Sequence, residues 1–186
     1  MEVLVDLDKS LFVFLNSLGN KSFDFLWLII TDKKTFIPLY IFLIYSLIKS
    51  FSKSSVYKYL FIVFLLILFT DQISGLFKDT FQRLRPCHDL SINDSIRIVK
   101  SSCGGLYGFF SAHASNTFAL ATFFYLIFKN KSNLFKLLFI WAFVVSYSRI
   151  YVGVHFPSDI VVGASFGIIS GYLFNYFSQK IILNDQ

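Results

Sequence analysis

The sequence is poor in charged residues and in residues that bind metal ions. Of its 186 residues, 15% are charged and 55% are hydrophobic, a balance that excludes an ordinary soluble domain of this size. Its three histidines and scattered aspartates do not form a metal-ligand set, so neither a metal nor another cofactor is predicted. The basic region of a signal peptide is also missing, because Glu2, Asp6 and Asp8 stand in its place.

Long apolar runs separate the charged residues, and each is close to the roughly 17–25 residues that cross a bilayer as a helix. The pattern predicts five membrane spans, at 35–50, 56–78, 108–128, 134–151 and 156–178. The predicted fold class is therefore all-α, a polytopic membrane helical bundle. We expect a single integral membrane domain over residues 1–186, with its transmembrane core at 35–180.

Residues 1–34 are too polar for a further span. Leucine and phenylalanine recur at helical spacing over residues 7–18, and a helix of that length lies in the membrane interface instead of crossing it. A short lead-in helix is predicted over residues 22–31. Joining both pieces into one span would bury four polar residues in hydrocarbon at a cost of several kcal/mol: Asn16, Asn20, Lys21 and Asp24.

The number of spans predicts the side on which each loop lies. With five spans, Lys78, His113, Arg149 and His155 all fall on one side. The opposite side carries lysines in short loops, and short basic loops stay in the cytoplasm: Lys49, Lys53, Lys58, Lys129, Lys131, Lys136 and Lys180. We therefore expect a multi-pass protein of the cytoplasmic (inner) membrane whose site faces the periplasm or the exterior. The net charge of +6 follows from this topology and predicts no nucleic-acid partner.

The connection at 79–107 is long for a small membrane protein, and long loops are usually either functional or disordered. It contains three of the four arginines and both cysteines, which favours a function. On the outward, oxidising side, a disulfide between Cys87 and Cys103 would brace this loop over the site. Two reduced thiols remain the alternative.

Three clusters on the outward side carry residues suited to chemistry on a phosphate. The first has Lys78 and Arg85 seven residues apart, so the two cations can meet on one anion if the helix bends at Pro86. The second opens the third span, where Ser111 is a natural N-cap and a helix N-terminus binds anions. His113, in the first turn of that helix, is placed to donate a proton to a leaving oxygen.

The third cluster runs from Ser148 to Asp159. Arg149 adds a permanently charged fork that suits phosphate. Pro157 suits the first turn of a helix, so a helix is predicted to start near His155, with Asp159 four residues later on the same face. The carboxylate can then hold one imidazole nitrogen while the other points at a substrate. Taken one at a time, the three clusters are better explained by helix capping and by side chains that snorkel to the membrane interface.

Two features inside the spans support a site. Asp71 lies seven residues before Lys78 on the same helical face, and a carboxylate within a membrane span is expected to brace one of the site cations. In the last span Gly163, Gly167 and Gly171 recur every four residues. Such a stripe of small residues predicts a neighbouring helix that approaches closely.

Together, the three clusters contain Lys-x6-Arg-Pro, Ser-x-His and Ser-Arg-x3-Gly-x-His-x3-Asp, in this order and each at a membrane boundary. The combination resembles the type 2 phosphatidic acid phosphatase superfamily, membrane lipid-phosphate phosphatases that share an active-site pattern with glucose-6-phosphatase and vanadium haloperoxidases. The resemblance covers roughly residues 70–165. The middle motif usually reads Pro-Ser-Gly-His, and here Phe110 and Ala112 replace the proline and the glycine.

The resemblance implies a role for each matching residue. His155 would attack phosphorus to form a phosphohistidine, oriented by Asp159, and His113 would protonate the leaving oxygen and then activate water. Five residues would hold the substrate phosphate: Lys78, Arg85, Ser111, Ala112 and Arg149. Three more match positions that set the geometry of the motifs: Pro86, Ser148 and Gly153. No metal is implied, since lysine and arginine cations can do the electrostatic work, and hydrolysis is expected to survive EDTA.

The resemblance therefore predicts a lipid phosphatase whose partner is a phosphate-bearing lipid in the membrane. A small apolar protein with an outward site looks most like the undecaprenyl-diphosphate phosphatases that recycle the bacterial cell-wall carrier. Phosphatidylglycerophosphate, phosphatidic acid and lipid A phosphatases, and a lipid phosphotransferase, are alternatives with the same chemistry. The alternative of another class is a non-catalytic protein that binds or moves anionic lipid, which would need the cations but neither histidine. The sequence does not fix the oligomeric state.

Overall fold

The apolar runs of the sequence fold as helices that lie side by side. A computed structural model describes residues 2–100 and 102–183, and its helices are α1 (Glu2–Ser17), α2 (Asp24–Thr31), α3 (Ile37–Ser50), α4 (Lys53–Phe81), α5 (Ala112–Phe128), α6 (Leu137–Tyr151) and α7 (Pro157–Leu183). Within these residues there is no β-strand, and the predicted all-α fold class is confirmed.

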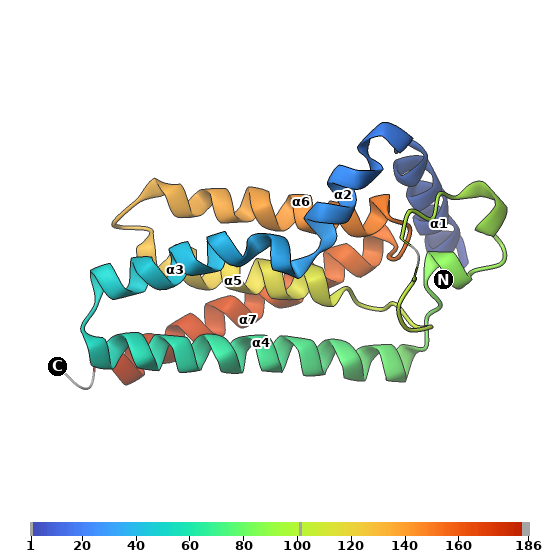
Figure 1. Cartoon of the computed structure of the whole chain (residues 1–186). Coiled ribbons are helices and arrows are strands. Elements are labelled where there is room, and N and C mark those ends of the chain that lie inside the picture. The colour runs from blue at the N-terminus through green and yellow to red at the C-terminus, as the bar shows by residue number, and fades with distance from the viewer. Residues whose placement is uncertain (1, 101, 184–186) are drawn as a thin grey trace.

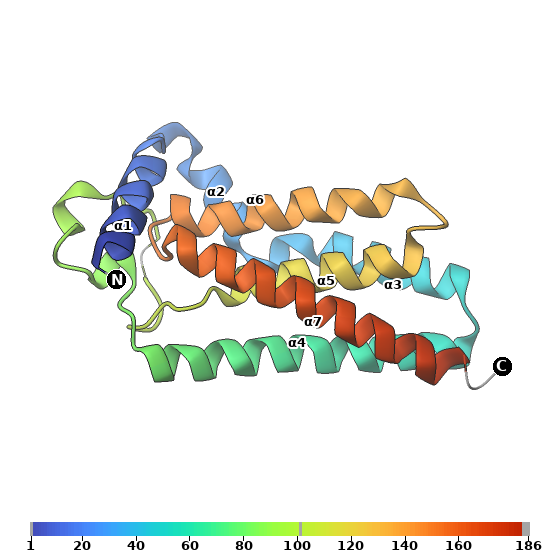
Figure 2. The same cartoon turned by 180° about the vertical axis from the view of Figure 1, so that it is seen from behind.

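The bundle consists of α3 to α7, and α1 and α2 pack at one of its ends, as Figure 1 shows. The loop from α4 to α5 and the connection from α6 to α7 lie at that same end. The α3–α4 and α5–α6 loops lie at the opposite end, where α7 also finishes (Figure 2). The three sequence clusters therefore share one end of the bundle, as the predicted topology requires.

The helices of the bundle are less uniform in length than the predicted spans. By length and composition, three of them can cross a membrane, namely Lys53–Phe81, Pro157–Ile182, and α6 with the turn before it, Asn133–Tyr151. In contrast, α3 has 14 residues and α5 has 17. Both start later than predicted, because Asp32 caps a 3₁₀ turn ahead of α3 and Ser111 caps α5 itself.

Large apolar side chains cover the outer faces of the bundle. Phe64 on α4, Phe143 on α6 and Val161 on α7 are all exposed. Contiguous apolar faces of this kind fit a hydrocarbon environment, in which the helices satisfy their own backbone hydrogen bonds. The interior, toward the end remote from α1, is a cluster of buried side chains that includes Leu47 and Phe123.

The N-terminal segment folds as two helices, as predicted, and not as one span. α1 begins earlier than the predicted 7–18, and α2 matches the predicted lead-in, with Asn20 capping the turn between them. Phe12 and Asn16 are fully buried in the protein. Helix α1 is thus packed onto the end of the bundle through one of its faces.

Glycines bring α5 and α7 into the most extensive contact of any helix pair. A Cβ atom on each glycine of the stripe would lie under 3.0 Å from a backbone oxygen: Gly163 against Ser111, Gly167 against Ser115 and Gly171 against Ala119. The close approach predicted from this stripe is confirmed, and it holds the start of α5 against the start of α7.

Replacing Gly167 by alanine is expected to destabilise the protein, because the new methyl group cannot enter without separating α5 from α7. Overpacking of this kind costs roughly 1–3 kcal/mol. The measurement is the midpoint of thermal unfolding in detergent. Gly75→Ala in α4 is the matched control, since nothing lies within 4 Å of its Cβ position and alanine is the better helix former by about 1 kcal/mol. Equal midpoints for the two variants would contradict the packing account.

Candidate active site

His155 lies in the connection between α6 and α7, at the end of the bundle where the motifs gather. Its side chain is buried, and its Nδ1 lies 3.2 Å from Oδ2 of Asp159 in the first turn of α7. Asp159 is fully buried, and the same oxygen accepts a hydrogen bond from the amide of Phe156 at 2.9 Å. The carboxylate therefore fixes the imidazole with Nδ1 toward Asp159 and Nε2 on the opposite side of the ring.

Burial sets the protonation state of His155 at neutral pH. It lowers the pKa of the imidazole to about 4, although the hydrogen bond with Asp159 acts in the opposite direction. The ring is therefore neutral near pH 7, with the proton of Nδ1 directed at the carboxylate. Nε2 then carries no proton, and its electron pair can act as a nucleophile.

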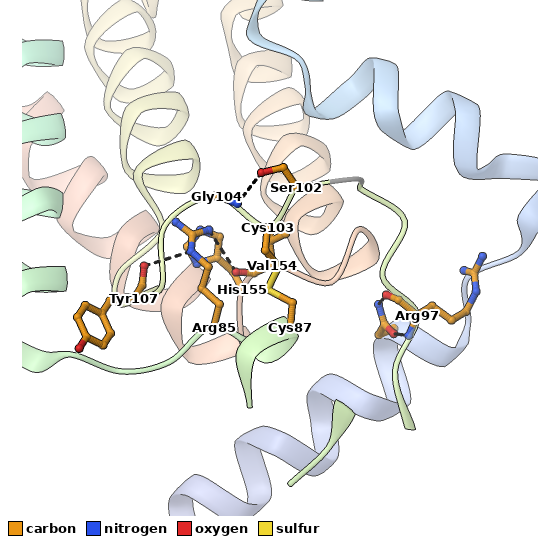
Figure 3. Close-up of a disulfide and its surroundings, with 10 residues drawn as sticks. Arg85, Cys87, Arg97, Ser102, Cys103, Gly104, Tyr107, Val154 and His155 are labelled. Carbon is orange, nitrogen blue, oxygen red and sulfur yellow. Dashed lines mark hydrogen bonds between the residues drawn. A yellow bond between two sulfur atoms is a disulfide. The ribbon is translucent and has the colours of Figure 1, made fainter. Parts of the chain in front are cut away.

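Arg85 brings a positive charge to Nε2 of His155. Its Nη1 lies 3.4 Å from that nitrogen, and Figure 3 shows the guanidinium turned toward the ring. Two backbone oxygens hold the side chain: Nε donates to Tyr107 at 3.1 Å, and Nη1 donates to Val154 at 3.5 Å. Burial lowers the pKa of Arg85 and Asp159 opposes that shift, but a guanidinium stays charged. A fixed cation thus stands where a phosphate would meet His155.

Arg149, at the end of α6, is 4% exposed. Its Nη1 donates to the hydroxyl of Thr31 at the end of α2, a contact that no sequence motif indicated. Its Nε is buried and has no hydrogen-bond partner among the residues that the structure describes. A buried charged donor without a partner is costly, and a phosphate oxygen would satisfy it.

Three more basic side chains belong to this group. Lys78, near the end of α4, and His113, in the first turn of α5, each lie close enough to Arg149 for their charges to interact. Lys33, in the turn between α2 and α3, interacts electrostatically with both Lys78 and His113. Like charges in so small a space repel one another, and an anion between them relieves the repulsion. From the sequence, Lys33 was not assigned to the site, because a lysine in a polar turn is usually explained by membrane topology.

Ser111 caps α5 as predicted, and its hydroxyl oxygen and its amide each make a hydrogen bond. Its hydroxyl accepts a hydrogen bond from the amide of Ala114 at 3.4 Å, and its own amide donates to the backbone oxygen of Asp159 at 3.0 Å. The amides of Ala112 and His113 follow in the first turn, where a helix has no carbonyl of its own to pair with them. These two amides are the donors that α5 offers to an anion.

Three residues shape the backbone around the site. Gly153 has a φ of +87°, and a Cβ there would lie 2.7 Å from a backbone oxygen of the α4–α5 loop, so the position requires glycine. Ser148 is fully buried, and its hydroxyl donates to the carbonyl of Val145 at 2.6 Å. Pro86 is buried and opens a 3₁₀ turn over Pro86–His88.

Asp71, which is expected to brace one of the site cations, forms no ion pair with Lys78 among the described residues. The carboxylate is exposed on α4 and takes part in none of the ion pairs between described residues. Seven residues span about 10 Å of helix, which is too far for a salt bridge with Lys78 unless both side chains bend. Its charge still acts on Lys78 over that longer distance.

An apolar cavity of about 360 Å³ opens from this group of cations, between α3, α4, α5 and α6. Thr31, Lys33 and His113 line its charged end, and its wall continues along α5 to Phe124 and across to Trp141. From His113 to Phe124 the helix rises by about 16 Å. A cavity with one charged end and a long apolar wall suits a lipid that carries a phosphate on its head.

Cys87 and Cys103 form a disulfide that closes the α4–α5 loop beside Arg85, as Figure 3 shows. Arg85 lies two residues before the first cysteine. Gly104 follows the second with a φ of +80°, and its Cβ position is 3.7 Å from the guanidinium carbon. The bond therefore ties together the two chain segments that enclose Arg85. His88 lies beside the sulfurs, but thiols bonded to each other are not available as metal ligands.

Loss of the disulfide is expected to lower both stability and activity. A cross-link over a loop of this length contributes roughly 3 kcal/mol to stability. Because a small misplacement of Arg85 is costly in transfer chemistry, kcat/KM on a lipid phosphate should fall roughly tenfold to a hundredfold. The measurement compares wild type and the Cys87→Ser, Cys103→Ser double variant with and without reductant.

Reductant should lower kcat/KM of the wild type to the level of the double variant and leave the double variant unchanged. Alkylation of both thiols verifies the reduction. Full activity of the reduced wild type would show that the bond does not hold Arg85 in place.

Sequence comparison finds a family and two curated relatives. A family described as the PAP2 superfamily matches residues 58–183. The chain is 36% identical over 183 residues to the lipid A 4′-phosphatase of Bacteroides thetaiotaomicron, which covers 97% of this chain and 81% of that protein. It is 38% identical over 189 residues to the lipid A 4′-phosphatase of Porphyromonas gingivalis, with 98% and 76% covered.

Solved structures share the architecture. The crystal structure of Aquifex aeolicus LpxE matches with a TM-score of 0.65 and 27% identity, over 89% of this chain and 92% of that chain. The transmembrane PAP2-type phosphatidylglycerolphosphate phosphatase from Bacillus subtilis matches with a TM-score of 0.77, over 97% of this chain and 89% of that chain. Its 18% identity supports the fold alone. The predicted membrane helical bundle is confirmed.

Proposed function

Since this chain belongs to the PAP2 superfamily and is a membrane lipid phosphatase, we propose that its substrate is lipid A and that it removes the 4′-phosphate. The enzyme is a hydrolase, so the alternative of a non-catalytic lipid binder is set aside. The undecaprenyl-diphosphate specificity expected for a small apolar protein with an outward site gives way to the lipid A alternative, because the relatives are lipid A 4′-phosphatases.

The observation that carries the proposal is the extent of the similarity to these two phosphatases. It covers 97% and 98% of the chain, so it takes in the N-terminal segment that lies outside the family match at 58–183. That segment brings Thr31 to Arg149 and Lys33 to the mouth of the apolar cavity. The similarity therefore extends over the N-terminal segment, which in the proposed complex faces the lipid.

The proposed reaction has two steps, and His155 carries the first. Its Nε2 attacks phosphorus while the bond from phosphorus to the lipid oxygen breaks, which leaves a phosphohistidine. Asp159 accepts the hydrogen bond from Nδ1 and stabilises the positive charge that the ring acquires. The phosphate oxygens and their developing charge would be held by the cations and helix amides described above: Lys78, Arg85, Arg149, Ala112 and His113.

His113 serves the leaving group in this mechanism. Of the two histidines, only His113 lines the apolar cavity, so a lipid bound there would present its ester oxygen to His113 and its phosphorus to His155. His113 gives its proton to that oxygen as the bond breaks. After the lipid has left, the same ring takes a proton from the water that attacks the phosphohistidine, and inorganic phosphate leaves. Both histidines then return to their starting states.

We propose further that the site faces away from the cytoplasm. The opposite end of the bundle holds the short α3–α4 and α5–α6 loops, which are rich in lysine. Short basic loops stay in the cytoplasm. The disulfide beside Arg85 fits the same assignment, because such bonds persist in oxidising compartments.

A phosphate-release assay on a panel of lipids tests the substrate. The panel contains lipid A with and without its 4′-phosphate, undecaprenyl diphosphate and phosphatidic acid, each with purified protein and EDTA. We expect kcat/KM to be highest, by about tenfold or more, for lipid A that carries the 4′-phosphate. His155→Ala protein, purified in the same way, corrects for contaminating phosphatases. Faster release from undecaprenyl diphosphate, or full inhibition by EDTA, would overturn the assignment.

A further inference from the structure

Arg83 contacts the carboxylate that orients His155, although it stands at an unspecified position of the Lys-x6-Arg-Pro motif. Its Nη1 donates to Oδ1 of Asp159 at 3.0 Å and to the hydroxyl of Ser158 at 2.6 Å. Its guanidinium also stacks over the ring of Phe156, with its central carbon 4.2 Å from the ring centroid. Because Oδ2 of Asp159 faces His155, the two oxygens of one carboxylate connect Arg83 to the imidazole.

Asp8, on α1, holds the other side of Arg83. Its Oδ2 accepts hydrogen bonds from Nη2 of Arg83 and from the hydroxyl of Ser158, both at 2.5 Å. Its Oδ1 accepts from the amide of Ser158 at 2.9 Å, at the start of α7, where a helix has amides without a partner of their own. Asp8 thus caps α7 from another helix and fixes the guanidinium at the same time.

The same face of α1 docks on the segment that carries His155. Phe12 packs edge-on against Phe156, with ring centroids 5.3 Å apart. The side-chain amide of Asn16 donates to the carbonyls of the last two residues of α6, both at 3.0 Å. Asp8, Phe12 and Asn16 recur every four residues and so lie on one side of the helix. The whole stripe supports the connection from α6 to α7.

We propose that Asp8 and Arg83 are positioning residues, which act on His155 through Asp159. The inference rests on the proposed function, in which His155 is the nucleophile. Arg83 occupies Oδ1, so the carboxylate cannot rotate away from the imidazole, and Asp8 keeps Arg83 in that place. Helix α1 therefore belongs to the catalytic apparatus, even though the family match begins at residue 58.

Asp8, Arg83 and Asp159 form a chain of contacts to His155, which we call the relay. Their charges also affect the protonation of His155. Four charged or titratable groups face the ring: Asp159 from α7, Arg85 from the α4–α5 loop, Arg149 from α6 and His113 from α5. Arg83 partly neutralises Asp159, so removal of its charge leaves a stronger anion beside the ring and raises the pKa of His155. Removal of the Asp8 charge should lower the pKa of His155. Arg83 then has Asp159 as its only anionic partner and neutralises that carboxylate more fully.

The test measures kcat, KM and the pH dependence of kcat/KM for three variants, on the lipid phosphate that the wild type turns over fastest. Arg83→Gln is expected to lower kcat roughly tenfold to a hundredfold with little change in KM. Since attack requires the neutral ring, the acid limb of kcat/KM should move to higher pH. Asp8→Asn should lower kcat less and move that limb to lower pH. Arg83→Lys should restore the position of the limb but only part of kcat, because an ammonium cannot bridge two carboxylates as a fork does.

Lys9→Gln is the matched control. Lys9 neighbours Asp8 on α1 and pairs with Asp89 of the α4–α5 loop at 2.7 Å, so it also joins the two segments. The pair does not involve Arg83 or Asp159, and its loss should leave kcat within about twofold and the pH profile unchanged. The thermal midpoint of each variant, taken in the same detergent, separates general destabilisation from positioning.

The possible results separate this inference from the proposed function. If His155→Ala retains turnover within tenfold of the wild type, the mechanism given under the proposed function fails and the relay fails with it. If His155→Ala is inactive while Arg83→Gln keeps the wild-type kcat and pH profile, only the positioning role fails. If Arg83→Gln does not fold, Asp8→Asn and Arg83→Lys decide the matter. An acid limb that is unshifted in Asp8→Asn, or that is displaced from the wild-type position in Arg83→Lys, would overturn the relay.

Discussion

Replacing His155 by alanine is expected to abolish phosphate release from every lipid phosphate that the enzyme accepts. Alanine has no atom that can attack phosphorus, and the groups nearest to Nε2 are cations, which cannot replace it. Loss of a nucleophile of this kind lowers kcat by roughly a factor of 10⁴ to 10⁶. The measurement is phosphate release, together with alkaline quenching, which preserves the acid-labile N–P bond, and detection of the phosphohistidine, which should form in the wild type and not in the variant.

Asp159→Asn keeps His155 as the nucleophile and changes only the group that orients its ring. The amide keeps the size of the carboxylate but does not stabilise a positive ring, so kcat should fall by a factor of roughly 10² to 10⁴ while some phosphohistidine still forms. His155→Ala leaves the Arg83–Asp159 pair intact, so its thermal midpoint should stay near that of the wild type. Turnover within tenfold of the wild type in His155→Ala would refute the mechanism even if the protein proved to be a lipid phosphatase.

The second large effect is expected at His113, and it should depend on the leaving group. General acid–base catalysis contributes a factor of roughly 10² to 10⁴, so His113→Ala should lose that much on lipid A, whose leaving alkoxide needs a proton. On an aryl phosphate with an alkyl tail, the phenolate leaves without an acid. The first step should then survive, and the phosphohistidine should accumulate because the attacking water lacks its base.

Rapid mixing of His113→Ala with the aryl phosphate measures this directly. We expect a burst of phenolate close to one equivalent per enzyme, followed by slow turnover. His88→Ala is the control, since that ring lies beside the disulfide and should leave both substrates near wild-type rates. Equal losses on lipid A and on the aryl phosphate, without a burst, would show that His113 does not act on the leaving oxygen.

The motif residues could be predicted because each cluster is local in sequence and stands where an apolar run ends. His155 and Asp159 are four residues apart, and the distance of 3.2 Å between Nδ1 and Oδ2 follows from that spacing once α7 begins at Pro157. Ser111 caps α5 for the same local reason. Asp71 shows where this reasoning stops, because a shared helical face did not bring its carboxylate to Lys78.

The supporting contacts were not predictable, because they join segments far apart in the chain. Asp8 meets Arg83 across 75 positions and Ser158 across 150, and Thr31 meets Arg149 across 118. In the sequence, Asp8 and Arg83 look like the charged residues of any membrane boundary. No periodicity links them, so neither could be assigned to the site.

By itself, the sequence determined the helical membrane class, the order of the apolar segments and the residues suited to act on a phosphate, since hydropathy and short motifs depend on neighbouring residues. The tertiary structure alone decided which charged side chains meet. It brought Thr31 and Lys33 to the phosphate site and Asp8 to Arg83, and it opened a cavity beside His113 for a lipid. The physical reason is that α1 and α2 fold back on the end of the bundle, and the packing of buried faces such as that of Phe12 and Asn16 sets that docking.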